Sequence, residues 1–122
     1  MRRLRDNGRV VNISSVAARG AQAGRPVYAA SKCAANSLVL SLAAKLGPRG
    51  ITVNTISPGA TYTELSAHIL EDKKKGPFIK EATALRRFGD PNDVADAVSL
   101  LLSPKGGWIT GQTIEATGGL WL

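Results

Sequence analysis

The sequence predicts an α/β fold in which a long helix connects two parallel strands. The prediction depends on a compact β-branched run at about residues 9–14, an alanine- and leucine-rich run at 27–46, and a second β-branched run at 51–56. A strand, a helix and a strand joined by short turns form a βαβ unit with parallel strands and a right-handed crossover. Because 122 residues suffice for one domain with a modest core, we treat residues 1–122 as a single domain.

Each element of this unit has its own local signals. The first strand, about Arg9 to Ser14, follows a glycine, and its compact β-branched run suits a buried strand. Val27 to Leu46 contain no proline and are followed by Gly47-Pro48, which predicts a helix that ends there. The second strand, Ile51 to Ile56, is followed by Pro58-Gly59.

The rest of the chain continues the same plan. Residues 63–75 are polar and weakly periodic, so we expect a mobile helix or loop there. Asp90 suits an N-cap with Pro91 at the first helical position, and apolar residues follow at helical spacing: Val94, Ala97, Val98, Leu101 and Leu102. A short strand at 113–116 precedes paired glycines. The sequence therefore predicts about three strands and three to four helices.

Composition and charge exclude several classes of protein. Hydrophobic residues make up 43% and charged residues 20%, and no apolar run approaches the ~20 residues of a membrane span. The basic start lacks the apolar stretch of a signal peptide, which predicts a cytoplasmic protein. The net charge is +7, but the basic residues form separate groups without a nucleic-acid motif, so we expect no nucleic-acid partner. The single cysteine, Cys33, can form no disulfide framework or cysteine metal site within the chain and is expected to pack.

Three side chains could carry acid–base chemistry. Tyr28 and Lys32 lie four residues apart near the predicted helix start, so their side chains share one face. Tyrosine is a poor base at neutral pH, but an adjacent ammonium favours its phenolate form. The Ser15 hydroxyl, at the carboxyl end of the preceding strand, would reach the same crevice and could hydrogen-bond a carbonyl oxygen as charge develops on it. Alone, the Tyr-x-x-x-Lys pattern also occurs by chance as a solvated pair, so its context is decisive.

That context resembles the short-chain dehydrogenase/reductase family from about Gly8 to the C-terminus. Tyr28 follows Ser15 by 13 residues, and the motifs that carry the resemblance occur in the family's order. They are Asn12-Ile13-Ser14-Ser15, Tyr28-Ala29-Ala30-Ser31-Lys32, Pro58-Gly59-Ala60-Thr61-Tyr62-Thr63, Phe88-Gly89-Asp90-Pro91-Asn92-Asp93-Val94-Ala95 and Ile109-Thr110-Gly111-Gln112. The resemblance implies the C-terminal, catalytic half of a doubly wound, Rossmann-like domain.

The resemblance also implies an oxidoreductase that uses NAD or NADP to interconvert a small-molecule carbonyl and an alcohol. Tyr28 would be the general acid or base, Lys32 would tune Tyr28 and bind the nicotinamide ribose, and Ser15 would orient the substrate oxygen. Ser14 is expected to point to the other face and pack. A turn near the nicotinamide carboxamide would contribute Pro58, Gly59, Thr61 and Thr63.

The chain departs from the family pattern in several places. It lacks the Gly-rich turn that lets backbone approach a pyrophosphate at a helix N-terminus. It also lacks the residue that selects NAD or NADP and the family's upstream active-site asparagine. Because about half of the expected domain is missing and residues 1–5 look like a helix end, we expect Met1 to be an internal methionine of a longer parent. Thr117 stands where the family usually has aspartate, a position expected to lie away from the chemistry.

Two functional hypotheses follow. In the first, the chain is the catalytic half of such an oxidoreductase, inactive or weak by itself. In the second, it is a non-catalytic half-domain that acts as an oligomerisation or partner-binding module. The small residues of the 27–46 helix match the family's dimer-forming helix and imply a homo-oligomer, a dimer or tetramer. Residues 64–78 fall where the family has a substrate lid, and His68 within them is expected to be solvated.

Overall fold

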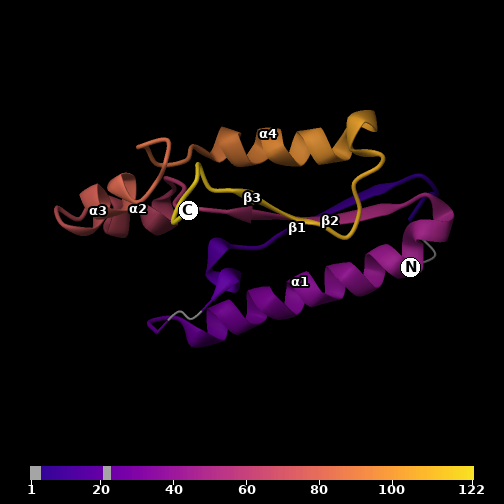
Figure 1. Ribbon diagram of the computed structural model, residues 1–122, viewed down its shortest axis with the longest axis horizontal. Helices are drawn as coiled ribbons and strands as arrows, with labels where there is room; N and C mark the ends of the chain where they lie inside the picture. Colours follow the sequence, from indigo (N-terminus) through magenta and orange to yellow (C-terminus); the bar gives the residue numbers. More distant parts are fainter. Residues whose placement is uncertain (1–3, 21–22) are drawn as a thin grey trace.

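A computed structural model describes residues 4–20 and 23–122 of the chain, and it has the predicted α/β architecture (Figure 1). The strands and helices alternate along much of the chain, with short 3-10 turns between some of them. They are β1 (Arg9–Ile13), η1 (Val16–Arg19), α1 (Pro26–Leu46), η2 (Gly47–Arg49), β2 (Thr52–Pro58), α2 (Glu64–Leu70), α3 (Lys75–Glu81), α4 (Pro91–Leu102), η3 (Pro104–Gly106) and β3 (Thr113–Ala116).

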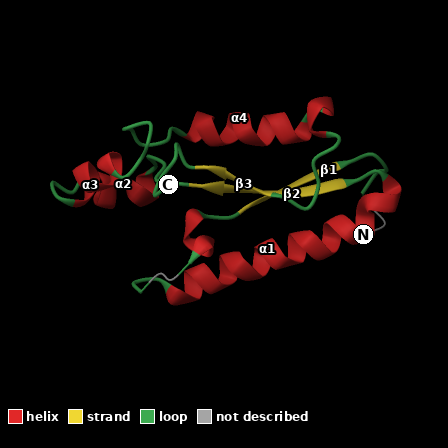
Figure 2. Ribbon diagram, viewed as in Figure 1, coloured by secondary structure: helices red, strands yellow, loops and turns green. Residues whose placement is uncertain are grey.

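The three strands form one parallel sheet in the order β1-β2-β3. Helix α1 lies on one face of the sheet and α4 on the other, so the fold is doubly wound as predicted (Figure 2). The central strand, β2, is buried from Thr52 to Ser57, which fits its unbroken run of side chains without charge. It extends beyond the predicted end at Ile56 because Pro58 still lies opposite Ala116 of β3.

The core forms where α1 packs on β2. Val39, Ala43 and Leu46 of α1 contact Ile51 and Val53 at the start of the strand, and partly buried Val10 and Leu42 extend the cluster. Ile51 and Val53 are at most 1% exposed. Burying one such side chain contributes roughly 1.5–3 kcal/mol, so this cluster stabilises the βαβ unit that the sequence predicts.

A buried asparagine connects β2 to the segment that leads into β3. Asn54 is 1% exposed, donates from Nδ2 to the Ile109 carbonyl at 2.7 Å and accepts from the Gln112 N–H at 3.0 Å. The Thr110 hydroxyl oxygen accepts from the Val53 N–H at 3.1 Å. The sequence motif Ile109 to Gln112 therefore aligns the chain on β2 before β3 begins.

Residues 63–75, expected to be a mobile helix or loop, contain the short helix α2, and a second short helix, α3, begins at their end. At the start of α2, the Thr63 N–H donates to the Ser66 hydroxyl at 2.9 Å. At the start of α3, an Asp72 carboxylate oxygen accepts from the N–H groups of Lys75 and Lys74 at 2.8 and 2.9 Å. The bonds from Lys75 and then Lys74 hold the pKa of the Asp72 carboxyl below its usual range. These capping interactions start each helix in an otherwise polar sequence.

Much of α1 remains exposed on the side away from the sheet. Val27 is 82% exposed, and Leu38 and Leu40 are each 58% exposed. By length and mean hydropathy, 1.2, the run Pro26–Arg49 could also cross a membrane, but a single helix that packs on a protein core can meet the same test. The prediction that Cys33 packs is wrong: it is exposed, and its thiol donates to the Ala18 carbonyl of η1 at 3.2 Å.

Part of the start of the chain, where a helix was expected to end, lies within the described residues. Residues 1–3 lie outside the described residues, and Leu4 and Arg5 are not helical. An ion pair between Asp6 Oδ1 and Arg49 Nε, 2.7 Å apart, instead holds this segment beside the turn that precedes β2.

Candidate active site

The carboxyl ends of the three strands meet the start of α1 and the pair α2–α3 at one end of the molecule (Figure 1). A pocket of about 550 Å³ opens there. Four of the residues predicted from sequence line it: Ser15, Tyr28, Gly59 and Thr61. Open α/β sheets bind ligands at this edge, so the fold places the predicted chemistry where a ligand can reach it.

Ser15 lies just beyond the end of β1. Its backbone is extended, and its hydroxyl oxygen accepts from the Ala17 N–H at 3.2 Å, which caps the η1 turn. This bond leaves the hydroxyl proton available for another acceptor in the pocket. Ser14 is 4% exposed and its N–H donates to the Ile56 carbonyl at 2.8 Å, which confirms that Ser14 packs.

Tyr28 lies in the first turn of α1, and Lys32 lies one turn later. The Lys32 ammonium nitrogen is 5.7 Å from the centre of the Tyr28 ring, and it donates to the Ile13 carbonyl at 3.0 Å. Tyr28 is 42% exposed and faces the pocket, whereas Lys32 is half-buried between the ring and the end of β1. The helix therefore holds a cation beside the tyrosine, as the four-residue spacing predicts.

The turn after β2 is held against the end of β3. The Gly59 N–H donates to the Ala116 carbonyl at 3.1 Å, and a Cβ atom on Gly59 would lie 2.9 Å from the Thr117 Cα atom. Only glycine allows this approach. Thr117 does not line the pocket at Ser15 and Tyr28, but it lies against Gly59, so residues after β3 support this turn.

The segment around Gly89 also forms hydrogen bonds with the turn that follows β2. The Gly89 N–H donates to the Ala60 carbonyl at 2.9 Å, and the Tyr62 N–H donates to the Gly89 carbonyl at 2.8 Å. Gly89 thus pairs with the turn as a short parallel bridge to Thr61. The position of residues 59–62 depends on how firmly the segment around Gly89 is held.

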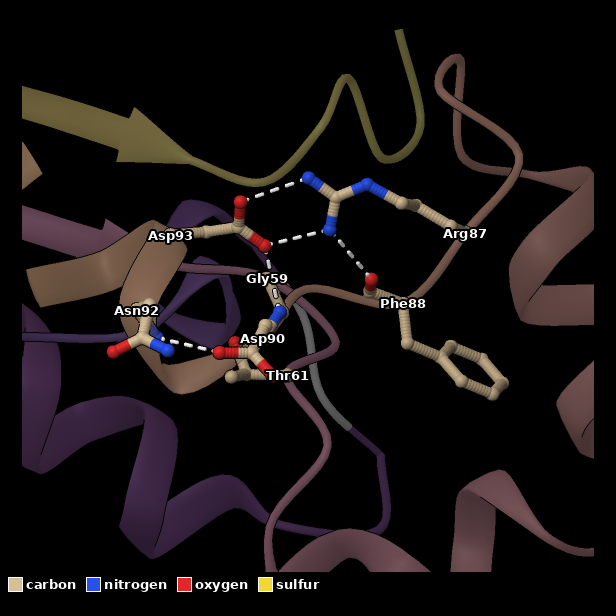
Figure 3. Close-up of polar contacts among 7 residues, drawn as sticks. All are labelled: Gly59, Thr61, Arg87, Phe88, Asp90, Asn92 and Asp93. Carbon is tan, nitrogen blue, oxygen red and sulfur yellow. Dashed lines mark hydrogen bonds and ion pairs between the residues drawn. The ribbon is translucent and has the colours of Figure 1, made fainter. Parts of the chain in front are cut away.

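An ion pair between Arg87 and Asp93 connects the two ends of the segment around Gly89, as Figure 3 shows. Arg87 donates from Nη1 and Nη2 to the two carboxylate oxygens of Asp93 at 2.6 and 2.8 Å, and from Nη1 to the Phe88 carbonyl at 3.0 Å. Asp93 also accepts from the Asp90 N–H at 2.6 Å, while Asp90 accepts from the Asn92 N–H at 2.9 Å. Hydrogen bonds from Arg87 and then from the Asp90 backbone hold the pKa of the Asp93 carboxyl far below its usual range.

Sequence reasoning missed the pairing of Arg87 with Asp93. It predicted Asp90 as the N-cap of the following helix, which the structure confirms, but it treated Arg87 only as one of several separate basic residues. An acidic residue three positions after an N-cap is the available signal, because such a side chain can turn back to the cap. The pairing of Arg87 with that side chain depends on the folded path of the chain.

Three of the predicted residues do not line the pocket: Lys32, which contacts the Tyr28 ring and the end of β1, and Pro58 and Thr63. Pro58 is the last residue of β2, and Thr63 lies at the start of α2, where its hydroxyl is 3.0 Å from that of Ser66. Nearby, the Tyr62 hydroxyl donates to the Glu71 carboxylate, and this hydrogen bond raises the pKa of Tyr62. In the described residues, therefore, Thr63 caps the start of α2 and Tyr62 contacts the residue that follows its end.

The donor set at this end of the sheet fits the nicotinamide end of a dinucleotide. Within the described residues, the backbone N–H groups of Ala60 and Thr61 have no hydrogen-bond partner, and both residues line the pocket. They suit the oxygen of a carboxamide, and the Lys32 ammonium suits ribose hydroxyls. The described residues contain no group of three or more His, Cys, Asp or Glu side chains that could hold a metal ion.

Comparisons with known proteins agree with this geometry. The family described as "Enoyl-(Acyl carrier protein) reductase" matches residues 1–121. "Dehydrogenase OXI1" of Cochliobolus heterostrophus is 42% identical over 98% of this chain and 53% of its own length. "3-oxoacyl-[acyl-carrier-protein] reductase FabG" of Vibrio cholerae is 36% identical over 94% of this chain and 46% of its own. The chain therefore spans about half the length of these curated relatives.

Solved structures are also similar to this chain, which again spans about half of their length. A short-chain dehydrogenase/reductase from Serratia marcescens superposes with a TM-score of 0.89 at 34% identity, covering 99% of this chain and 49% of that one. A blue fluorescent protein from a metagenomic library, solved in complex with NADPH, gives a TM-score of 0.86 at 34% identity over 99% of this chain and 48% of that one.

Proposed function

Because the chain belongs to the short-chain dehydrogenase/reductase family, we propose that it carries the proton-transfer part of an active site that interconverts a carbonyl and an alcohol. The observation that carries the proposal is the pocket in which Ser15 and Tyr28 meet the turn at Gly59 and Thr61. A hydrogen-bond donor, a proton donor and a carboxamide-binding turn around one cavity are what carbonyl reduction requires.

In the direction of reduction, Tyr28 gives its hydroxyl proton to the carbonyl oxygen, and the Ser15 hydroxyl donates a hydrogen bond to the same oxygen. The Lys32 ammonium beside the ring stabilises the tyrosinate that remains. A bound reduced nicotinamide would supply the hydride, the electron pair of the new C–H bond. In the direction of oxidation, the tyrosinate takes the proton from the alcohol.

We propose NAD or NADP as the cofactor, held by its nicotinamide end. The N–H groups of Ala60 and Thr61 would donate to the carboxamide oxygen, Lys32 would bind the ribose, and Thr63 would lie close by. Pro58 and Gly59 would contribute by setting the path of this turn. The NADPH complex of the metagenomic protein supports this choice of cofactor class.

A truncated cofactor tests the proposal on the chain itself. Reduced nicotinamide mononucleotide contains the part of the cofactor that Lys32 and the turn at residues 59–61 would contact. We expect it to shift the backbone amide signals of Ala60 and Thr61 and to support slow reduction of a reactive aldehyde that disappears in Tyr28→Phe. Unchanged Ala60 and Thr61 signals together with Tyr28-independent turnover would refute the proposal.

The second candidate is a non-catalytic oligomerisation or partner-binding module. The exposed apolar side of α1, with Val27 at 82% and Leu38 at 58% exposure, favours it. If the truncated cofactor fails to bind while the chain self-associates, this second function is supported. In either case we propose a cytoplasmic homo-oligomer, a dimer or tetramer, and for the first function a small-molecule carbonyl or alcohol substrate.

A further inference from the structure

The pocket at Ser15 and Tyr28 has an uneven chemical lining. Beyond these residues it is mostly apolar: Val16, Ala17, Leu65, Ile69, Leu70, Ile79, Leu120 and Trp121. Two cationic or potentially cationic side chains, Arg25 and His68, also line it, and none of the described lining residues is Asp or Glu. The described wall therefore combines an apolar surface with an excess of positive charge.

Neither of these two side chains has a partner among the described residues. Four other arginines are each paired with a carboxylate: Arg19 with Glu115, Arg49 with Asp6, Arg86 with Glu81 and Arg87 with Asp93. Arg25 and His68 form no such ion pair and no side-chain hydrogen bond within the described part of the chain.

Two acids that follow α2 already have other contacts, and Glu64 of α2 does not line the pocket. Glu71 accepts from the Tyr62 hydroxyl, and Asp72 accepts from two backbone N–H groups at the start of α3. Neither acid lines the pocket. Arg25 and His68 are therefore available to bind an anion that enters the pocket.

The placement of the two side chains relates them to the proposed reaction. Arg25 lies three residues before Tyr28, at the N-cap of α1, and both residues line the same pocket. His68 comes from α2 on another wall of the same pocket. A molecule whose carbonyl oxygen reaches Tyr28 and Ser15 can therefore place a second polar group between Arg25 and His68.

From these observations we infer that Arg25 and His68 form an anion-binding subsite, and that the substrate is an apolar carbonyl compound that also carries a carboxylate. The inference rests on the proposed function for the position of the carbonyl. The guanidinium of arginine presents parallel N–H donors that match a carboxylate, and histidine adds a further donor. A neutral analogue would fill the same apolar surface but leave this subsite without its anion.

A matched pair of ligands tests the subsite by binding. 4-Oxo-4-phenylbutanoate has an aromatic group, a carbonyl and a carboxylate, and its methyl ester replaces the charged carboxylate with a neutral group of similar shape. The indole N–H signal of Trp121, which lines the pocket, reports binding, and that of Trp108, 99% exposed and absent from the lining, is an internal control. We expect the acid to bind at least about tenfold more tightly than the ester, because hydrogen bonds to charged groups are among the stronger ones.

Variants separate the subsite from the rest of the pocket. Arg25→Gln and His68→Gln should each weaken binding of the acid by roughly threefold to tenfold and leave the ester unchanged, and Arg25→Lys should restore part of the loss. Lys105→Gln removes one exposed positive charge from the η3 turn and should change neither affinity.

Equal affinities for the acid and the ester, or acid binding that survives both glutamine variants, would overturn the inference. Loss of acid binding in Lys105→Gln as well would also overturn it, by showing a general charge effect. The proposed function is tested separately, by the truncated cofactor and by Tyr28→Phe. Its failure can therefore be distinguished from a failure of the subsite.

Discussion

Arg87 binds both carboxylate oxygens of Asp93 through both of its terminal nitrogens, at 2.6 and 2.8 Å (Figure 3). The two residues flank Gly89, whose N–H and carbonyl hold the Ala60–Tyr62 turn at 2.9 and 2.8 Å. An exposed ion pair contributes little to stability by itself, but a bidentate pair with a further backbone bond restricts the loop that it closes. The pair therefore fixes the position of the turn proposed to hold the nicotinamide.

Breaking this pair should loosen the turn before it unfolds the domain. In Asp93→Asn we expect faster hydrogen exchange at the amides of Gly89 and Tyr62, with little change at Thr55 in the central strand. Asp96→Asn, on the same helix and exposed, is the matched control and should behave like the natural chain. Equal acceleration at Thr55 would show that Asp93 supports the whole fold instead.

The same pair predicts a specific pH dependence of stability. Its hydrogen bonds hold the pKa of Asp93 below the unfolded value, so its contribution is complete above about pH 4, the ordinary value for aspartate, and is lost as the pH falls further. The difference in urea midpoint between the natural chain and Asp93→Asn should be present at neutral pH and shrink below about pH 4. A difference that persists at the lowest pH would contradict this assignment.

Removing the hydroxyl of Tyr28 should affect chemistry without affecting folding. Within the described residues this hydroxyl makes no hydrogen bond and faces the pocket, so Tyr28→Phe loses no contact that stabilises the fold. General acid–base catalysis contributes roughly 10²–10⁴-fold, so the variant should lose nearly all turnover with reduced nicotinamide mononucleotide. Circular dichroism and the melting temperature should match those of the natural chain, and a near-normal rate would remove Tyr28 from the mechanism.

Two glycines give a matched test of how tightly the turn rests on the segment after β3. A Cβ atom at Gly59 would lie 2.9 Å from the Thr117 Cα atom, whereas one at Gly47 meets nothing within 4 Å. Gly59→Ala should therefore destabilise the fold by about 1–3 kcal/mol. Gly47 has helical angles of −49° and −46°, so Gly47→Ala should be neutral or slightly stabilising. Similar urea midpoints for the two variants would show that the Gly59 contact is not tight.

The strands, α1 and α4 could be predicted because each depends on signals within its own segment. The β-branched runs identify the strands, and Asp90-Pro91 marks the start of α4 where the structure has it. The βαβ connection then brings Ser15 and Tyr28 to one edge of the sheet. These parts of the site follow from order and spacing along the chain.

The remaining parts depend on contacts between distant segments. The C-terminal residues turn back toward the end of α3, where the Trp121 N–H donates to the Ala82 carbonyl at 3.0 Å, and so complete the pocket. The pocket position of His68 likewise depends on how α2 packs, so the expectation of a solvated histidine describes its exposure but not its location. No pattern within residues 63–75 or 117–122 shows these contacts.

We expect the chain to self-associate. Strand β1 has a partner on only one side in the described sheet, and Leu38 of α1 is 58% exposed. Unpaired strand edges and exposed apolar side chains favour association. Light scattering at micromolar concentration should give the mass of at least a dimer. Leu38→Glu should lower the measured mass, whereas the control variant, Leu100→Glu on α4, should leave it unchanged. A compact monomer of 12.8 kDa would contradict this prediction.

The last prediction concerns turnover: the 122-residue chain should be inefficient with NAD(H) or NADP(H). The residues proposed for proton transfer are present, but the sequence has no Gly-rich turn for the pyrophosphate, and contacts remote from the reacting atoms are what position a cofactor. Misplacement of the nicotinamide by about 1 Å can cost roughly 10²-fold in rate. Calorimetric titration with both cofactors, together with an assay on a panel of reactive carbonyls, should therefore give weak binding and little turnover. Micromolar binding with Tyr28-dependent turnover, in a preparation whose mass excludes a longer chain, would show that these residues build a complete cofactor site.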